Sequence, residues 1–278
     1  MLRRDRWVVA GTIGIIAALA WGYVLSLAGK MEMGGMNMTG FRMVPAGMGI
    51  MLPATAPWTA MEFAYVFLMW AVMMVGMMGP SVAPMILMYA RVGRQGKVGG
   101  RLFVATGWFA GGYLFAWAGF SLAATIFQWL IQRAALLDSR MTIASHEVGG
   151  IVLIAVGLYQ WTPFKDFCLA QCQTPFQFLM RHGGFRGDLR GCLVLGFRHG
   201  LYCVGCCWIL MSLLFVGGVM NVLWVAALSI LVLLEKVTPF GTWIARMAGL
   251  VFLVAGVAMS GLAAAISGLF FPFTVAGV

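Results

Sequence analysis

The sequence has little charge and very few acidic residues. Of its 278 residues only 9% are Asp, Glu, Lys or Arg and just 8 are acidic, whereas 62% are hydrophobic. The mean hydropathy is +0.96. A chain so poor in charge cannot cover a water-soluble domain of useful size. It therefore predicts an all-α polytopic transmembrane helical bundle in contact with the lipid bilayer, because helices satisfy their own backbone hydrogen bonds in lipid.

Several common signatures are also missing. The sequence has no P-loop and no soluble nucleotide-binding domain, which disfavours an ATP-driven pump. The net charge of +10 does not indicate a nucleic-acid partner, because the Lys and Arg residues lie at the ends of apolar runs. The six cysteines form no spaced extracellular framework, so most are expected to be reduced thiols. No internal repeat or linker divides the chain, and residues 1–278 are treated as one integral membrane domain.

The apolar runs predict about seven membrane spans with the N-terminus inside. A span needs about 20 apolar residues, and basic connections at 91–101 and 165–190 are expected on the cytoplasmic side of a bacterial inner membrane. Six spans would remain if the first were a cleaved signal or the sixth re-entrant. Glu235 and Lys236 end the sixth run and are expected to form its cytoplasmic boundary. The expected spans are about 7–27, 62–89, 102–131, 148–163, 191–216, 219–234 and 243–270.

The most unusual apolar run, at 191–216, contains His199 beside Cys203, Cys206 and Cys207. At about 100° per residue, His199, Cys203 and Cys206 fall within about 60° of one another on a helix, and Cys207 borders that face. Imidazole and thiolate ligands suit copper(I), zinc and, less often, iron–sulfur chemistry. Buried cysteines also act as small hydrophobes. Polar groups at membrane depth are costly, however, and favour a functional site.

A second cysteine pair precedes this run. Cys168 and Cys172 are spaced i and i+4, so a helix there points both sulfurs in the same direction. They are expected near the cytoplasmic base of the fifth span. The spacing fits either metal ligands or a thiol pair without a metal.

Methionine is abundant, with 22 residues in the chain. A thioether binds soft ions without deprotonation, so a methionine-rich external segment could collect copper(I), although Met is also an ordinary filler of helix contacts. Pro80 and Pro84 should kink the second span beside its sulfurs. The candidate ligands in the external segment are Met31, Met33, Met36 and Met38. Those in the second span form two stripes, Met69, Met73 and Met77 on one and Met74 and Met78 on the other.

Several uncommon blocks occur in order between about residues 61 and 249. They are Met69-Trp70 to Met78 with Pro80-Ser81, Tyr159-Gln160, Thr162-Pro163, Lys165, Cys168, Cys172, Arg198-His199-Gly200, Cys203, Cys206-Cys207-Trp208, Met211 and Glu235-Lys236. Together they resemble an uncharacterised bacterial family of predicted metal-binding integral membrane proteins, a domain of unknown function. The resemblance implies a multi-spanning inner-membrane protein with suspected metal ligands. Residues 61–249 are then a family-like core, preceded by the first span and external segment (1–60) and followed by the last span (250–278).

These features favour a membrane protein that binds a soft metal, copper(I) before zinc or another soft ion. External methionines and internal thiols grade from weak to tight ligands. Such a gradient suits transport, or delivery involving a metallochaperone or a membrane metalloenzyme, more than an enzymatic activity of its own. Two alternatives remain open. One is a thiol-disulfide oxidoreductase that uses Cys203 and Cys206, and the other is a structural assembly subunit without bound metal.

Overall fold

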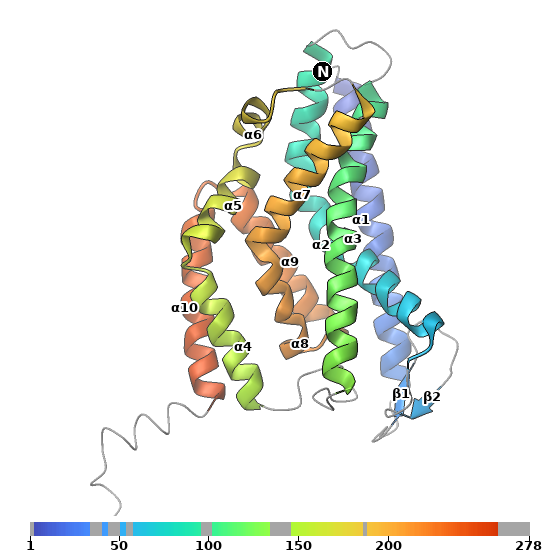
Figure 1. Ribbon diagram of the computed structural model, residues 1–278, viewed down its shortest axis with the longest axis vertical. Helices are drawn as coiled ribbons and strands as arrows, with labels where there is room; N and C mark the ends of the chain where they lie inside the picture. The colour runs from blue at the N-terminus through green and yellow to red at the C-terminus, as the bar shows by residue number, and fades with distance from the viewer. Residues whose placement is uncertain are drawn as a thin grey trace, which may run out of the picture.

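The computed structural model describes residues 3–33, 41–43, 51–53, 58–95, 102–133, 146–185 and 188–260. These residues form an elongated bundle of helices, as expected from the composition (Figure 1). One short antiparallel strand pair, β1 (Phe41–Met43) and β2 (Met51–Pro53), lies at one end and aligns Phe41 with Pro53. The expectation of a polytopic helical bundle is confirmed.

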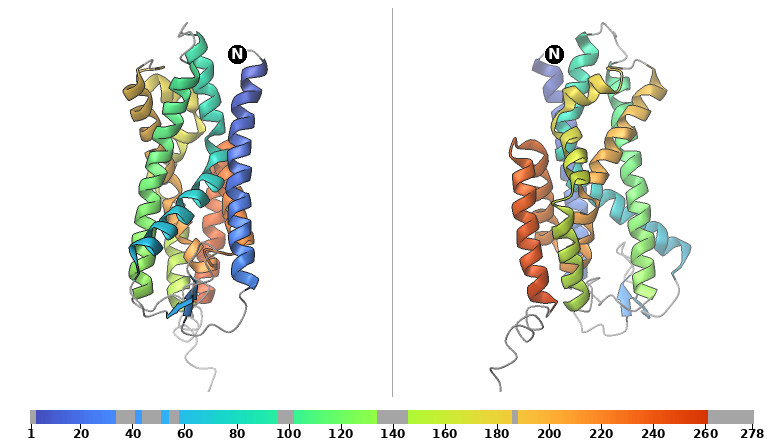
Figure 2. Two further views of the ribbon diagram at one scale, coloured as in Figure 1. Left: turned by 90° about the vertical axis from the view of Figure 1, so that its right-hand side faces the viewer. Right: turned by 60° about the vertical axis from the view of Figure 1, so that its left-hand side comes forward.

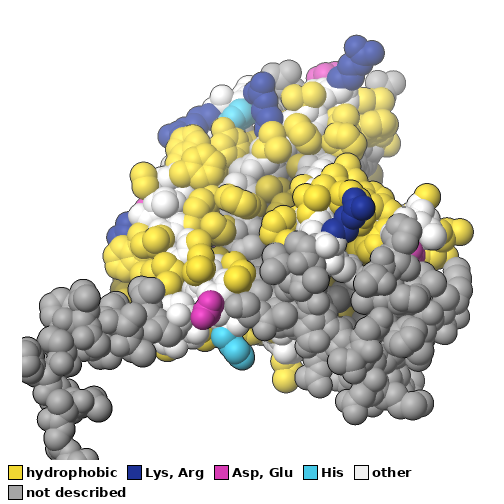
Figure 3. Space-filling model, turned by 60° about the horizontal axis from the view of Figure 1, so that its bottom comes forward, with side chains coloured by type: hydrophobic (Ala, Val, Ile, Leu, Met, Phe, Trp, Pro, Cys, Tyr) yellow, Lys and Arg dark blue, Asp and Glu magenta, His cyan; other side chains and the backbone are white. Residues whose placement is uncertain are grey.

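Five of the described helices are long and apolar enough to cross a membrane. They coincide with the first, second, third, fifth and seventh expected spans. These helices are α1 (Arg3–Met33), α2 (Ala60–Gln95), α3 (Leu102–Arg133), α7 (Leu189–Ser212) and α10 (Gly241–Met259). Hydrophobic side chains cover much of the described surface in Figure 3, as a lipid-facing flank requires.

The fourth and sixth expected spans are shorter helices. α4 (His146–Tyr159) has 14 residues and α9 (Val222–Val237) has 16. At 1.5 Å per residue they extend for about 21 and 24 Å, which is less than the roughly 30 Å of a bilayer core. Each is followed within four residues by a Thr-Pro pair, and proline cannot continue the helical hydrogen bonds of the preceding turn. The order of apolar runs is as expected, but two of them form helices shorter than a full span.

Three short helices complete the described chain: α5 (Pro163–Gln173), α6 (Pro175–Arg181) and α8 (Leu214–Gly217). α5 begins at Pro163, and the Thr162 hydroxyl accepts a hydrogen bond from the Lys165 backbone N–H at 3.4 Å. α5 packs against α7, while α6 continues to the end of the bundle where α2 ends and α3 begins (Figure 1). Lys165 is fully buried. The side chain of this first residue of the expected cytoplasmic connection at 165–190 therefore points into the bundle, which the sequence interpretation did not anticipate.

α7 is the helix on which the other elements around the cysteines pack. Its backbone touches that of α3: a Cβ atom at Gly196 would lie only 1.9 Å from the Phe109 carbonyl oxygen, and one at Gly112 only 2.1 Å from that of Leu193. α2, which contains Pro80 and Pro84, leans across the bundle, and α4 and α10 pack together on one side (Figure 2). This arrangement brings α2, α3, α5 and α9 around α7.

Candidate metal centre

Four cysteine side chains from α5 and α7 meet inside the bundle. Cys203, Cys206 and Cys207 share one face of α7 and are 2%, 1% and 0% exposed. Cys172, near the end of α5, is half-buried, and its thiol lies close enough to those of Cys203 and Cys206 to interact with them. We call Cys172, Cys203, Cys206 and Cys207 the thiol cluster. All four are free cysteines.

The thiol cluster is not arranged as a closed coordination shell. Cys206 Sγ and Cys207 Sγ donate hydrogen bonds to the Cys203 carbonyl oxygen at 3.1 and 2.9 Å. Within the described residues, no group of three or more His, Cys, Asp or Glu side chains is placed so that it could hold a metal ion. The donor set is that of a soft-metal site. To ligate an ion together, however, the thiols of Cys206 and Cys207 would have to rotate away from the backbone.

A lysine and a tyrosine surround Cys203. The Lys236 ammonium, in the last turn of α9, donates to Cys203 Sγ at 2.8 Å and lies 3.9 Å from Cys207 Sγ and 3.8 Å from Met78 Sδ. The Tyr113 hydroxyl of α3 lies 3.0 Å from Cys203 Sγ. Lys236 is only 6% exposed. Its side chain thus points into the bundle, although Val237, the last residue of α9, is 55% exposed.

A buried polar ring lies next to the thiol cluster. Lys165 Nζ donates to Glu235 Oε2 at 2.8 Å and also to Gln160 Oε1, while Gln160 Nε2 donates to Glu235 Oε1 at 3.4 Å. Lys165, Glu235 and Gln160 are at most 1% exposed. Gln173 of α5 donates to the Glu235 and Thr238 carbonyl oxygens at 2.7 and 3.4 Å, which satisfies the open end of α9. These contacts tie the ends of α4, α5 and α9 together.

His199 borders the thiol cluster on the side that faces α6. It lies one turn before Cys203, is 3% exposed, and packs among Phe178, Phe109 and Tyr113 at ring-centroid distances of 5.0, 6.1 and 6.0 Å. Its Nδ1 atom has no hydrogen-bond partner in the described part of the chain. A buried nitrogen without a partner costs about 1–3 kcal/mol. The position therefore leaves an imidazole nitrogen available beside the thiols.

Cys168 lies one turn before Cys172 on α5 and also faces α7. A Cβ atom at Gly205 would lie 3.0 Å from Cys168 Sγ. The two α5 sulfurs thus point toward the same helix, as their spacing predicted, and Cys172 is the one that joins the thiol cluster.

The α2 methionines extend away from the thiol cluster toward the end of the bundle that carries the strand pair. Met78 reaches Lys236, as described above, while Met69, nine residues earlier, lies about 13 Å further along the helix axis. Met69, Met73, Met74 and Met77 are 0–2% exposed, which fits packing as well as ligation. Met36 and Met38 lie outside the described residues. Met31 and Met33 end α1, but their side chains also lie outside the description.

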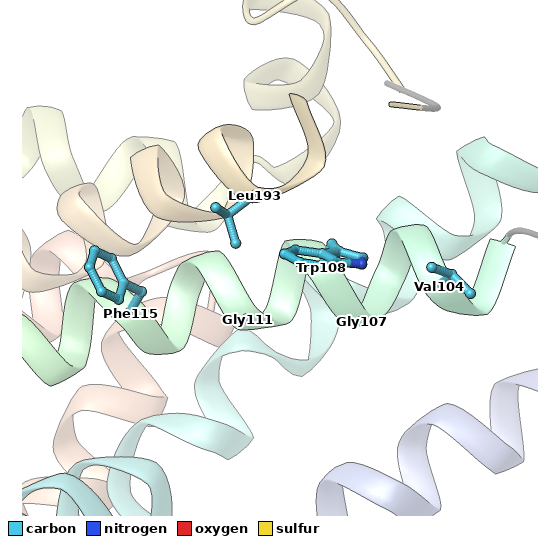
Figure 4. A pocket seen from close by; sticks show the side chains of 6 residues that line it. All are labelled: Val104, Gly107, Trp108, Gly111, Phe115 and Leu193. Atoms are coloured by element: carbon cyan, nitrogen blue, oxygen red, sulfur yellow. The ribbon is translucent and has the colours of Figure 1, made fainter. Parts of the chain in front are cut away.

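An apolar groove on the flank lies apart from these sulfurs. Its lining residues are Val104, Gly107, Trp108, Gly111, Phe115 and Leu193 (Figure 4). None of them carries a sulfur atom. The candidate metal centre is thus a packed cluster inside the bundle and not an open pocket.

Sequence reasoning missed the roles of Lys236, Tyr113 and the Lys165–Glu235 pair. The available signal was the pair Glu235-Lys236 inside a predominantly apolar sequence, since ionisable residues at membrane depth are usually functional. Tyr113 gave no comparable signal, because a single tyrosine is common near helix contacts.

Comparison with known proteins gives one match. No curated protein and no solved structure matches the chain significantly. A family model, PpoB2, described as a copper chaperone, matches residues 67–259, the region that contains the thiol cluster, Lys236 and the buried polar ring. The match agrees with the expected resemblance to a metal-related family. Because the match covers more than half of the sequence, the chain belongs to the PpoB2 copper chaperone family.

Proposed function

We propose that this protein holds copper(I) at the thiol cluster within a membrane and delivers it to a membrane metalloprotein. The observation that carries the proposal is the meeting of three buried thiols of α7 and the half-buried Cys172 of α5 beside Met78 of α2. Soft thiolate and thioether donors favour copper(I) over hard cations. Membership of a copper chaperone family supports copper as the cargo, in preference to zinc or another soft metal.

The α2 methionines supply a route to the thiol cluster. Thioethers bind copper(I) without losing a proton, whereas thiolates bind it more tightly. A cation that moves along α2 from Met69 to Met78 therefore meets stronger donors at the end of its path. His199 lies on the other side of the thiol cluster, next to α6. It is the candidate ligand for a cation that leaves the cluster toward α6.

Burial favours metal binding over the alternative of disulfide exchange. Exchange requires a partner thiolate to reach a sulfur atom directly, but Cys203 and Cys206 are 2% and 1% exposed. A purely structural subunit is also disfavoured. It would have no need to bury Lys165, Glu235 and Lys236, because apolar side chains pack a membrane bundle at lower cost.

Metal retention by the purified full chain tests the proposal. Protein in mild detergent is loaded without oxygen with copper(I) or with silver(I), a soft monovalent substitute, then separated from free metal and analysed by mass spectrometry. Wild type should retain the cation, and Cys203→Ser or Cys206→Ser should weaken binding by more than about tenfold, since even changes beyond the ligands cost ten- to a hundredfold. His199→Phe is measured in the same series.

Cys192→Ser is the matched control. Cys192 is also buried on α7, but it accepts a hydrogen bond from the Tyr89 hydroxyl at 3.2 Å, about three turns before the thiol cluster. Equal retention in wild type, Cys203→Ser and Cys206→Ser would contradict the proposal. In sealed proteoliposomes, Cys203-dependent release of trapped silver(I) would show transport across the bilayer in place of delivery.

A further inference from the structure

Lys236 places a positive charge at the position where a metal ion would have to bind. Its ammonium nitrogen is surrounded by three sulfur atoms from two other helices: Cys203 Sγ at 2.8 Å, Met78 Sδ at 3.8 Å and Cys207 Sγ at 3.9 Å. The side chain is nearly fully buried. A cation that binds these sulfurs must therefore share the cluster with the ammonium or displace it.

The carboxylate next to Lys236 in the sequence is already paired with other side chains, so the Lys236 ammonium interacts with the sulfur atoms instead. The adjacent carboxylate, Glu235, is bound to Lys165 Nζ at 2.8 Å and to Gln160 on its other oxygen. Lys236 also lies in the last turn of α9, where the helix dipole favours a positive charge. The ammonium is thus held by the end of its own helix and by the sulfur atoms in front of it.

A fixed positive charge acts differently on cations of different charge. Repulsion is proportional to the product of the two charges, so a divalent ion meets twice the repulsion of a monovalent ion at the same distance. Screening by salt is weak for buried charges. The sulfur donors by themselves would accept copper(I) and zinc alike, and the charge of Lys236 supplies the distinction that the donors lack.

We propose that Lys236 makes the thiol cluster selective for monovalent soft cations over divalent ones. This inference rests on the proposed function, since it assumes that the thiol cluster binds metal. Lys236 is a specificity-determining residue in this role and not a ligand. The copper chaperone would then exclude zinc by charge, even though zinc binds well to clusters of cysteine thiolates.

Competition between silver(I) and cadmium(II) tests the inference. Both probes are soft cations of different charge, and the full chain in detergent is equilibrated with each alone and with both together. Each variant is compared with wild type, so the different coordination geometries of the two ions enter both ratios alike. Wild type should retain silver(I) in preference to cadmium(II). Lys236→Leu, which removes the charge without adding a sulfur donor, should raise the ratio of bound cadmium to bound silver by at least about tenfold.

Two further variants separate charge from structure. Lys236→Arg keeps the charge and should keep the preference of wild type. Arg246→Met removes a positive charge from the exposed pair between Arg246 and Asp166, which lie 3.2 Å apart, and should also leave the ratio unchanged. Size-exclusion chromatography checks that each variant remains folded. If Lys236→Leu aggregates, Lys236→Gln makes the same comparison with an uncharged polar side chain.

The possible failures are distinguishable. If wild type retains silver(I) but Lys236→Leu and Lys236→Gln show the same cadmium-to-silver ratio as wild type, the inference is wrong and the proposed function stands. If wild type retains neither cation, the proposed function is wrong and the inference falls with it.

Discussion

The ion pair between Lys165 and Glu235 is placed where charge is expensive. Moving two ions out of water costs several kcal/mol each, and their attraction offsets this only when geometry and additional hydrogen bonds are good. Here the 2.8 Å contact is supplemented by the Gln160 amide, which bonds to both partners. The pair links α5 to α9. Because Lys236 follows Glu235 directly, the same link sets the position of the ammonium at the thiol cluster.

Breaking this pair should therefore destabilise the protein. Glu235→Leu leaves the Lys165 ammonium buried without its carboxylate, and we expect a loss of about 3–5 kcal/mol in the free energy of unfolding. The double variant Lys165→Met with Glu235→Leu should recover most of that loss, because it removes both charges. Asp166→Asn, which disrupts the more exposed pair with Arg246, is the control and should cost less than about 1 kcal/mol.

Thermal or denaturant unfolding in detergent, followed by intrinsic tryptophan fluorescence, measures these changes. Equal losses in the single and double variants would show that the charges do not act as a pair. In that case Glu235 would contribute to the free energy of unfolding through packing alone.

The sequence predicted the thiols better than the charged residues around them. Helical spacing placed Cys203 and Cys206 on one face and directed Cys172 toward the same side as Cys168, and these relations follow from local geometry alone. The buried position of Lys236 could not be predicted in this way, because charged residues at the end of an apolar run usually mark a membrane boundary. Its burial depends on the pairing of Glu235 with Lys165, 70 positions away in the chain, which no local pattern encodes.

At the scale of the helices, hydropathy identified the apolar runs but not the length of each helix or the place where it ends. α2, α3 and α7 correspond closely to their expected spans. α4 and α9 were expected to reach both surfaces, whereas each is too short and ends beside the buried polar ring. A helix too short to span the bilayer can end within it only where other parts of the protein bond to its last carbonyl groups. Gln173 does this for α9. That partner lies on another helix and is not predictable from the run itself.

The glycines of α3 show a similar limit. In the sequence Gly107, Gly111, Gly112 and Gly119 equally predict close helix contact, but only Gly112 among them has a neighbour within 4 Å of an added Cβ atom. Gly111 instead lines the apolar groove of Figure 4. Which glycine meets α7 depends on the rotation of the helix, and that is set by the packing of the whole bundle.

A matched pair of alanine substitutions tests this contact. Gly196→Ala would place a methyl group 1.9 Å from the Phe109 carbonyl oxygen, so α3 and α7 must separate, and we expect a loss of about 1–3 kcal/mol in stability. Gly111→Ala adds the same methyl group where nothing lies within 4 Å and should have little effect. Silver(I) retention should fall in Gly196→Ala as well, because Tyr113 of α3 contacts Cys203. Identical melting temperatures for the two variants would show that the helices tolerate the separation.

At the scale of the whole molecule, the two ends of the bundle differ in charge. The end formed by α6 and the adjoining ends of α2, α3 and α7 carries basic side chains, and the N-terminus lies at that end as well (Figure 1). They include Arg91, Arg181 and Arg190. The opposite end contains the start of α4, with Glu147 in its first turn, and the end of α3, with the single Arg133 in its last turn. Because basic connections remain on the cytoplasmic side, we expect the chain to lie with α6 inside and the strand pair outside.

This orientation can be measured with protease-cleavable tags in the full chain, expressed in a bacterial cytoplasmic membrane. A tag inserted after Gly184, between α6 and α7, should be protected in spheroplasts and cut in inverted vesicles. A tag inserted after Ser139, between α3 and α4, should show the opposite pattern, and retained silver(I) binding would confirm that each tagged protein is folded. The consequence for function is direct, because Met69 lies on the outer side of the thiol cluster in this orientation and His199 on the inner side. If the tag after Gly184 is cut in spheroplasts, the methionines of α2 face the cytoplasm and the cation would travel from the cell interior outward.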